Sequence, residues 1–253
     1  MSPEYTPTEL MAIAMARSFR DGEVVVMGAV PTIPLAACRL AQTLHAPTLS
    51  YIVGGSGTVN PTPAALPTQS CDPKLEGGPC TLPLPDVVLL EGRGDVLDVF
   101  CAGGLQIDAH GNCNLVSVGD WARPALRGPG TVGLPFLPAV RRSVIFTMTH
   151  DPRTFVERVD FVSGPGHPAG PTEDRPYRRE GPTMVITPFA SLDFEPESRR
   201  MRLVSTHPGI HEEEVRRATG FELAPGPVAE TEPPSQEELA ALRRVDPTGV
   251  LRR

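Results

Sequence analysis

The sequence predicts an α/β protein with an open, mostly parallel sheet, helices on both faces, and an added antiparallel portion in the C-terminal half. Two observations predict this fold class. Segments of helical periodicity alternate with short apolar runs along the first 53 residues, and such alternation is typical of a parallel sheet covered by helices. The apolar runs are continuous rather than alternating, as in strands that are buried on both faces.

Local signals place the elements in order. Thr6 and Glu9 frame Pro7 in an N-terminal capping box, which begins a helix over residues 7–20. A turn at Asp21-Gly22 then leads into the first buried strand, residues 23–28. The other expected elements are a helix over 34–44, strands over 49–53, 96–101, 143–149 and 159–163, antiparallel strands over 183–187 and 201–205, and helices over 211–219 and 235–245.

We expect one domain over residues 1–253, because a chain of this length can bury one sizeable core. Prolines and glycines concentrate near residues 60–85, 164–182 and 224–234. Loops of this length in a compact domain are usually functional or covered by a partner. We therefore predict that these three Pro/Gly-rich segments, called arms below, lie at an interface with a partner.

Composition excludes several classes of protein. The net charge of −7 argues against a surface for nucleic acid or anionic membranes. No stretch approaches the roughly 20 apolar residues of a membrane-spanning helix, and the N-terminus lacks the regions of a signal peptide. We expect a cytoplasmic protein whose partners are proteins and small molecules. No metal site is expected, because the five cysteines contain no C-x-x-C pair, and Pro208 and Gly209 break the helical spacing of His207 and His211.

The strongest local signal is the turn Gly54-Gly55-Ser56-Gly57, which follows the second buried strand. Ligands bind at the carboxyl ends of strands in such sheets, and glycines let another molecule approach the backbone. Ser56 is the only side chain in this turn. A flexible turn with an incidental serine is the alternative, and a hydrolase triad is not supported, because the G-x-S-x-G pattern is absent here.

A second glycine segment runs from Gly128 to Gly133 and matches the string G-x-G-x-x-G. It contains Pro129, follows no predicted strand and opens no predicted helix, so we reject a dinucleotide-binding fingerprint. Its backbone amides can still face a carbonyl oxygen, as in an oxyanion or thioester contact. An ordinary tight turn is the other interpretation.

Several segments, taken in order, resemble beta-type subunits of the class I CoA-transferase family. They include the Tyr5-Thr6 helix start, strand 22–28, Ala46-Pro47, Gly103 to Asp108 with Gly111 to Asn114, Ser117 to Asp120, Val159 to Gly166, Arg200 to Leu203 and Ala218 to Phe221. The resemblance implies a CoA-transferase type, Rossmann-like fold. It also implies an alpha-type partner, commonly in a heterotetramer, and an acyl-CoA substrate with no cofactor other than the CoA of that substrate.

In true transferases of this family a glutamate after the second buried strand attacks the thioester. That position matches Gly54 here, so ordinary CoA transfer is doubtful. Two offshoots of the family lack the glutamate: one hydrolyses a ring in steroid-derived CoA thioesters, and the other is a cofactor-free decarboxylase acting on 3-methylglutaconyl-CoA. We favour the decarboxylase, which carries a cysteine where this chain has Ser56. A transferase subunit, a ring-opening hydrolase subunit and a non-catalytic partner subunit are the alternatives.

The matching motifs suggest roles for individual residues. Loss of CO2 leaves electrons on the thioester oxygen, which calls for hydrogen-bond donors. We expect amides of Gly103 and Gly104, and of the loop Gly128, Gly130, Thr131, Val132 and Gly133, to supply them. Ser56 and Gln106 would orient the acyl group or a water, beside a backbone left open by Gly54, Gly55 and Gly57.

Overall fold

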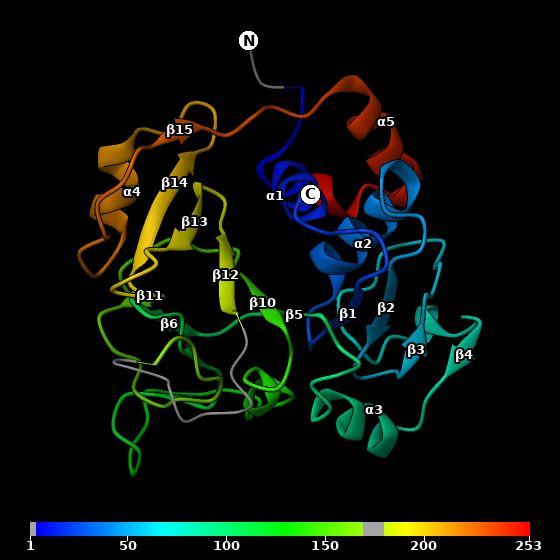
Figure 1. Cartoon of the computed structure of the whole chain (residues 1–253), viewed down its shortest axis with the longest axis horizontal. Coiled ribbons are helices and arrows are strands. Elements are labelled where there is room, and N and C mark those ends of the chain that lie inside the picture. Colours follow the sequence, from blue (N-terminus) through cyan, green and yellow to red (C-terminus); the bar gives the residue numbers. More distant parts are fainter. Residues whose placement is uncertain (1–3, 169–179) are drawn as a thin grey trace. The chain divides into compact units, whose positions relative to one another are not determined.

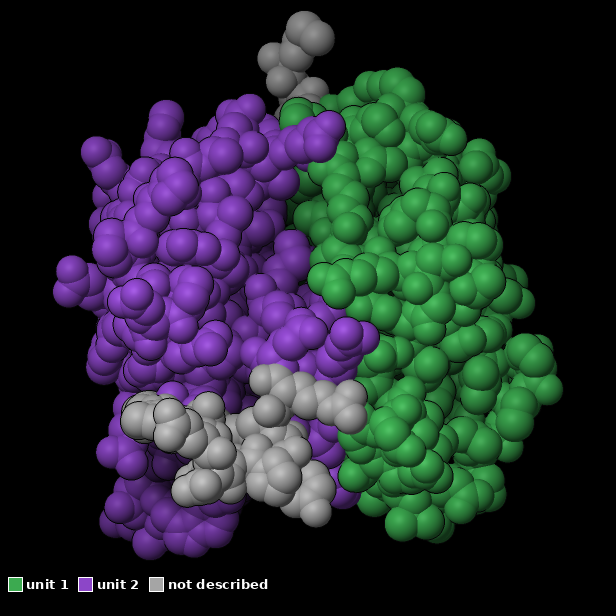
Figure 2. All heavy atoms as spheres, in the orientation of Figure 1, with its two compact units in different colours: residues 1–101, 233–253 green, residues 102–232 purple. Residues whose placement is uncertain are grey.

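The computed structural model describes residues 4–168 and 180–253. The chain divides into two compact units, of which unit 1 comprises residues 1–101 and 233–253 and unit 2 comprises residues 102–232 (Figure 2). Part of the arm expected over 164–182, namely residues 169–179, lies outside the described residues. The expectation of one functional domain over the whole chain stays a prediction.

Unit 1 has a sheet with a parallel centre. Its elements are α1 (Pro7–Arg17), β1 (Val24–Met27), α2 (Thr32–Leu44), β2 (Ser50–Val53), β3 (Thr58–Val59), the 3-10 helix η1 (Pro73–Leu75), β4 (Cys80–Thr81), α3 (Leu84–Glu91), β5 (Val99–Ala102, whose last residue is the first of unit 2), α5 (Gln236–Val245) and the 3-10 helix η3 (Val250–Arg252). The strand order is β5-β1-β2-β3-β4. β1 pairs parallel with both β2 and β5, whereas β3 and β4 extend the sheet antiparallel.

The helices of unit 1 begin at the predicted capping boxes. The Thr6 hydroxyl accepts from Glu9 N at 3.1 Å, and the Glu9 carboxylate accepts from Thr6 N at 2.9 Å. Ser235 and Glu238 form the same box at α5. α5 packs against α1 and α2, as Figure 1 shows for the red helix beside the two blue ones. An ion pair of 2.7 Å between Arg17 and Glu238 joins α1 to α5, so the C-terminal segment completes the core of unit 1.

Unit 2 carries the antiparallel portion of the fold. Its elements are β6 (Gln106–Asp108), β7 (Cys113–Asn114), β8 (Ser117–Val118), β9 (Leu126–Arg127), the 3-10 helix η2 (Leu134–Phe136), β10 (Arg142–Phe146), β11 (Phe155–Val156), β12 (Gly181–Ile186), β13 (Ala190–Phe194), β14 (Met201–Thr206), α4 (Glu212–Ala218) and β15 (Ala229–Glu230). The main strands run β10-β12-β13-β14-β15, with β13 antiparallel to both neighbours. Two small sheets, β11-β6-β7 and β8-β9, complete the unit. The predicted α/β class with an antiparallel C-terminal portion is confirmed.

Three expectations need correction. No strand forms over 159–163, because Asp160 N donates to the Gln106 side chain and the Ser163 hydroxyl accepts from Leu115 N, so this segment bonds to neighbouring loops. The strands predicted over 183–187 and 201–205 exist but do not pair directly. β13, which we did not predict, lies between them. α1 ends at Arg17 rather than residue 20, where the Ser18 hydroxyl donates to Met15 O at 2.7 Å.

Two arms contain regular structure that was not predicted. Prolines at 83 and 85 start α3 at the end of the arm over 60–85, because proline suits the first helical turn. The arm over 224–234 contributes β15. The loop from Gly128 does follow a strand, β9, and precedes η2, contrary to expectation. β9 is a two-residue antiparallel strand and η2 a single turn, so the strand-to-helix unit of a dinucleotide site is still not formed here.

Candidate active site

The glycine turn 54–57 closes a hairpin at the carboxyl ends of two parallel strands. Gly54 N donates to Met27 O of β1 at 3.0 Å, and Gly57 N donates to Val53 O at 2.8 Å. Gly57 has a φ of +68°, which other residues rarely adopt, and the chain then returns as β3. The turn therefore lies at the edge of the sheet where α/β proteins usually bind ligands.

Two of the three glycines are required by this chain's own packing. A Cβ atom at Gly55 would overlap the Ser70 hydroxyl oxygen and lie 2.9 Å from the Cys71 sulfur. A Cβ atom at Gly57 would overlap Leu82 O. Packing thus accounts for Gly55 and Gly57 without a ligand.

Gly54 differs from its neighbours. A Cβ atom there would lie 3.1 Å from Met27 O and 3.6 Å from Oε1 of Glu91. The first distance is a tight contact and the second is an ordinary one. The φ of Gly54 is not positive. There is therefore room for a side chain at position 54, and that side chain would face the carboxyl group of Glu91 at the end of α3.

The Ser56 hydroxyl is engaged within the turn. It donates to Val53 O and accepts from Thr58 N, each at 3.3 Å. Among the described residues no histidine or carboxylate bonds to it. A serine without a neighbouring base remains a poor nucleophile, so the geometry favours a turn-closing role.

Glu91 is a site residue that sequence reasoning missed. It ends α3 and is 6% exposed, and its side chain forms no hydrogen bond or ion pair with any other described residue. Burial raises the pKa of its carboxyl from the ordinary 4.5 to about 7. Such a group can both donate and accept a proton near neutral pH. The only signal in the sequence was a glutamate closing the apolar run Val87 to Leu90.

The Glu91 carboxyl is also open to its surroundings. Within residues 4–168 and 180–253, no fully buried side-chain nitrogen or oxygen lacks a hydrogen-bond partner. Because the Glu91 carboxyl oxygens have no hydrogen-bond partner, they are not among the fully buried atoms. This carboxyl is mostly dry and yet reachable from outside the core.

In unit 2 the predicted residues gather around segment 114–116. A Cβ atom at Gly104 would lie 3.0 Å from Asn114 O, and one at Gly128 would overlap Leu115 O. Gly128 N donates to Val116 O at 2.8 Å, so this amide is already occupied. A Cβ atom at Gly103 would lie 3.0 Å from Phe146 O, and close packing again suits glycine.

The amides of Gly130, Thr131, Val132 and Gly133 form no hydrogen bond to another described residue. Gly130 has a φ of +107°, and Val132, about half exposed, has a φ of +51°. A β-branched residue in the left-handed region costs on the order of 1–2 kcal/mol. Strain of this kind concentrates at ligand-binding loops, which supports a binding role for this one.

Gln106 is an internal crosslink. Its Nε2 donates to Asp160 at 2.9 Å, while its Oε1 accepts from Asn114 Nδ2 at 2.7 Å and from Asp160 N at 3.1 Å. These bonds favour positioning of the surrounding loops over direct substrate contact. Its orienting role stays a prediction.

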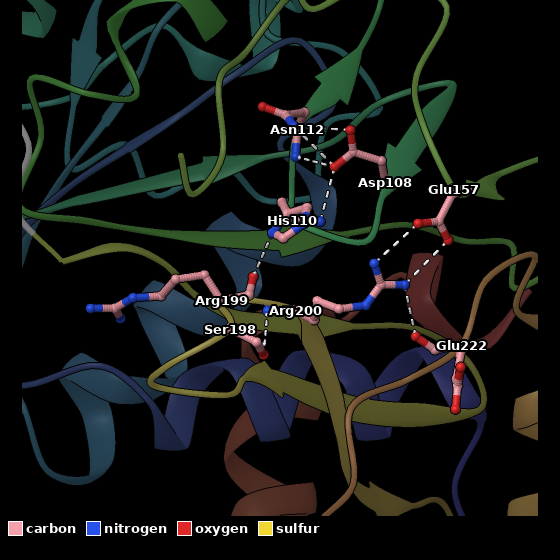
Figure 3. Close-up of polar contacts among 8 residues, drawn as sticks. All are labelled: Asp108, His110, Asn112, Glu157, Ser198, Arg199, Arg200 and Glu222. Carbon is pink, nitrogen blue, oxygen red and sulfur yellow. Dashed lines mark hydrogen bonds and ion pairs between the residues drawn. The ribbon is translucent and has the colours of Figure 1, made fainter. Parts of the chain in front are cut away.

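The connection after Gln106 is the tight turn that its residues predicted. Asp108 accepts from the backbone of His110 and from both the backbone and side chain of Asn112 (Figure 3). Nearby, Arg200 pairs with Glu157 at 3.0 Å and donates to Glu222 O. The side chains of Asp108, Asn112, Glu157 and Arg200 are all engaged in bonds within this cluster, which indicates a structural role.

The predicted site residues thus fall into two groups. Gly54, Gly55, Ser56 and Gly57 lie in unit 1 with Glu91, and the remaining predicted residues lie in unit 2. In the part of the chain that the structure describes, no three metal-ligating side chains come together, and no helix is both long and apolar enough to cross a membrane.

Comparison with known proteins places this chain among CoA-acting enzymes. The family model described as Coenzyme A transferase matches residues 8–218. The chain is 30% identical over 253 residues to the B-type subunit of glutaconate CoA-transferase from Acidaminococcus fermentans, covering 96% of this chain and 93% of that protein. It is 31% identical over 249 residues to the cholesterol ring-cleaving hydrolase IpdB subunit of Mycobacterium tuberculosis, covering 97% and 96%.

Solved structures agree with these matches. Glutaconate coenzyme A-transferase of A. fermentans superposes with a TM-score of 0.87 at 28% identity, covering 99% of this chain and 98% of that one. The decarboxylase AibA/AibB superposes with a TM-score of 0.81 at 26% identity, covering 98% of each chain. A transferase, a hydrolase and a decarboxylase therefore share this fold along nearly the whole chain.

Proposed function

The chain belongs to the coenzyme A transferase family, and we propose that it is the B-type subunit of a cofactor-free decarboxylase converting 3-methylglutaconyl-CoA to 3,3-dimethylacrylyl-CoA and CO2. The observation that carries this proposal is Gly54, which leaves the turn after β2 without a carboxylate. The proposal includes an A-type partner, in a cytoplasmic heterotetramer that binds the acyl-CoA. The glutaconate CoA-transferase relative supports such a partner, because it is itself named as one of the subunits of its enzyme.

Covalent CoA transfer needs a nucleophile that this turn lacks. A transferring carboxylate must form a mixed anhydride and then a glutamyl thioester. Gly54 has no side chain, and the Ser56 hydroxyl bonds only to backbone atoms of its own turn. Glu91 is the nearby carboxyl, but it is mostly protonated below about pH 7, which makes it a weak nucleophile and a good acid.

Decarboxylation makes demands that the chain's residues can meet. The pair of electrons released with CO2 delocalises through the double bond onto the thioester oxygen, which becomes an oxyanion. The unbonded amides of Gly130 to Gly133 are candidate donors to it. A poorly solvated carboxylate loses CO2 more readily, because its localised charge loses more from desolvation than the charge that is spread over the dienolate.

Ring-opening hydrolysis of a CoA thioester is the second candidate. It is supported by the 31% identity with the cholesterol ring-cleaving hydrolase relative over 97% of this chain. This reaction adds water across a carbon–carbon bond and releases no CO2. It also dispenses with a covalent nucleophile, so Gly54 alone does not separate it from decarboxylation.

One experiment distinguishes these activities. The chain is purified with its A-type partner and incubated with 3-methylglutaconyl-CoA, and CO2 release and the thioester product are measured. Stoichiometric CO2 and 3,3-dimethylacrylyl-CoA support the proposal. Absence of CO2 together with CoA exchange between free acids, or with hydrolysis of a cyclic acyl-CoA, refutes it. The Glu76→Gln complex, which removes an exposed carboxyl of unit 1, serves as a matched control and should retain the activity of the unsubstituted complex.

A further inference from the structure

We propose that Glu91 is a further catalytic residue, the proton donor that completes the decarboxylation at the turn of Gly54. The inference rests on the proposed function. It deepens that function by naming the group that quenches the carbanion left when CO2 departs. Three observations on unit 1 support it.

The first is position. Oε1 of Glu91 lies 3.6 Å from the place of a Cβ atom at Gly54. A glutamate side chain at position 54 would hold its own carboxyl oxygens on the order of 3–4 Å from its Cβ atom, given standard bond lengths. Glu91 therefore brings a carboxyl to the surroundings of position 54 from a different element, the C-terminal end of α3.

The second is the lack of a partner. Buried acidic groups are normally paired or hydrogen-bonded, because an isolated charge in a dry site is costly. The other buried acidic residues of the described chain follow this rule, with bonds to the backbone or to an arginine: Glu9, Glu23, Asp108 and Asp246. Among the buried acidic residues of the described chain, only the Glu91 carboxyl has no bond to another described residue, and its oxygens are not fully buried. A buried carboxyl without a partner favours its protonated form and can therefore act as a proton donor.

The third is that Glu91 lies on a regular element, the helix α3. Glu91 ends a helix whose start is set by Pro83 and Pro85 and whose Val87 is fully buried. Gly92 caps the helix, with its N–H donating to Val88 O at 3.2 Å. Catalytic groups on regular elements hold their geometry better than groups on mobile loops. The raised pKa of the Glu91 carboxyl agrees with this role, since the acid form is populated near neutral pH.

The step balances without an oxidant or a metal. The bond between the γ-carbon and the substrate carboxylate breaks, CO2 leaves, and the electron pair passes to the dienolate of the thioester. The O–H bond of Glu91 then breaks and its proton forms the new C–H bond at the γ-carbon. The Glu91 carboxylate takes a proton back from water, which restores the acid.

The test follows hydrogen exchange in the product. The two-subunit complex is incubated in D2O with 3,3-dimethylacrylyl-CoA, and deuterium entering the γ-methyl groups is followed by NMR. This exchange reverses the protonation step and needs no CO2 release, so it separates the inference from the proposed function. Glu91→Gln is compared with Glu76→Gln, which removes an exposed carboxyl of the same unit.

We expect Glu91→Gln to slow exchange on the order of 100-fold, as for loss of a general acid, and to remove the limb of the pH profile near pH 7. Glu76→Gln should match the unsubstituted complex. If Glu91→Gln fails to assemble with the A-type partner, Glu91→Asp decides, and it should show slowed exchange with a shifted limb. Exchange within about twofold of the unsubstituted rate in the assembled variant, or no exchange in the unsubstituted complex, overturns the inference. Exchange without CO2 release refutes only the proposed function.

Discussion

Replacing Glu91 with glutamine should make the chain more stable at alkaline pH. The carboxyl has a pKa of about 7 in the folded chain and an ordinary value of 4.5. The folded state therefore holds a proton that the unfolded state has already released across this window. Stability contributed by this group is present below about pH 4.5 and is lost as pH rises to about 7. Glutamine resembles the neutral carboxyl and avoids that loss.

The magnitude follows from the two pKa values. Their difference is 7 − 4.5 = 2.5, and each unit corresponds to about 1.4 kcal/mol, so the ionised carboxyl costs about 3 kcal/mol once it is fully charged. Because Glu91 is only 6% exposed, solvent screening does little to reduce this figure. At about pH 5 the Glu91 carboxyl of the folded chain is still mostly protonated, and the linkage relation gives a stability cost of only about 1 kcal/mol.

Urea unfolding followed by circular dichroism measures the difference. Glu91→Gln should exceed the unsubstituted chain by about 3 kcal/mol at about pH 8 and by about 1 kcal/mol at about pH 5. The comparison is made at equal pH, so other titrating groups cancel, and Glu76→Gln should track the unsubstituted chain at both values. A Glu91→Gln variant that is less stable than the unsubstituted chain at about pH 8 would refute the reasoning, because it would reveal a favourable partner for the carboxylate.

Three further predictions concern the turn and the buried histidines. Gly57→Ala should destabilise the chain by about 2–3 kcal/mol in urea unfolding, because the added Cβ would overlap Leu82 O at a positive φ; an unchanged midpoint would contradict the packing reason. Ser56→Ala should change the unfolding free energy by less than about 1 kcal/mol, since its two hydrogen bonds are long; a larger loss in calorimetry would show that the hydroxyl is essential to the turn. Burial lowers the pKa of His150 and of His207 from 6.5 to about 4, so stability is lost as pH falls through that window, by up to about 3 kcal/mol each. His207→Gln should flatten the pH dependence of the unfolding free energy between about pH 6.5 and about pH 4, and a slope equal to that of the unsubstituted chain would oppose this assignment.

Much of the fold could be predicted because its signals are local. The capping boxes at Thr6 and Ser235 depend on residues three apart, and both helices begin there. β1 and β2 are continuous apolar runs bounded by glycine, which a buried parallel strand requires. β13 was missed, because Ser191 and Asp193 interrupt its apolar residues, and the segment does not stand out from a loop until β12 and β14 pair with it. The segment 159–163 has the composition of a strand, but it bonds to loops instead.

The residues of the candidate site divide in the same way. The sequence by itself determined that position 54 is glycine and that Ser56 is the only side chain in its turn, since these are matters of identity and order. Only the tertiary structure decided that Gly55 and Gly57 fit against Ser70 and Leu82. It also decided that the carboxyl of Glu91 lies beside position 54, where this chain has no carboxylate of its own. A residue's burial and pKa depend on what other elements bring around it, and only the tertiary fold brings Glu91 of α3 close to Gly54.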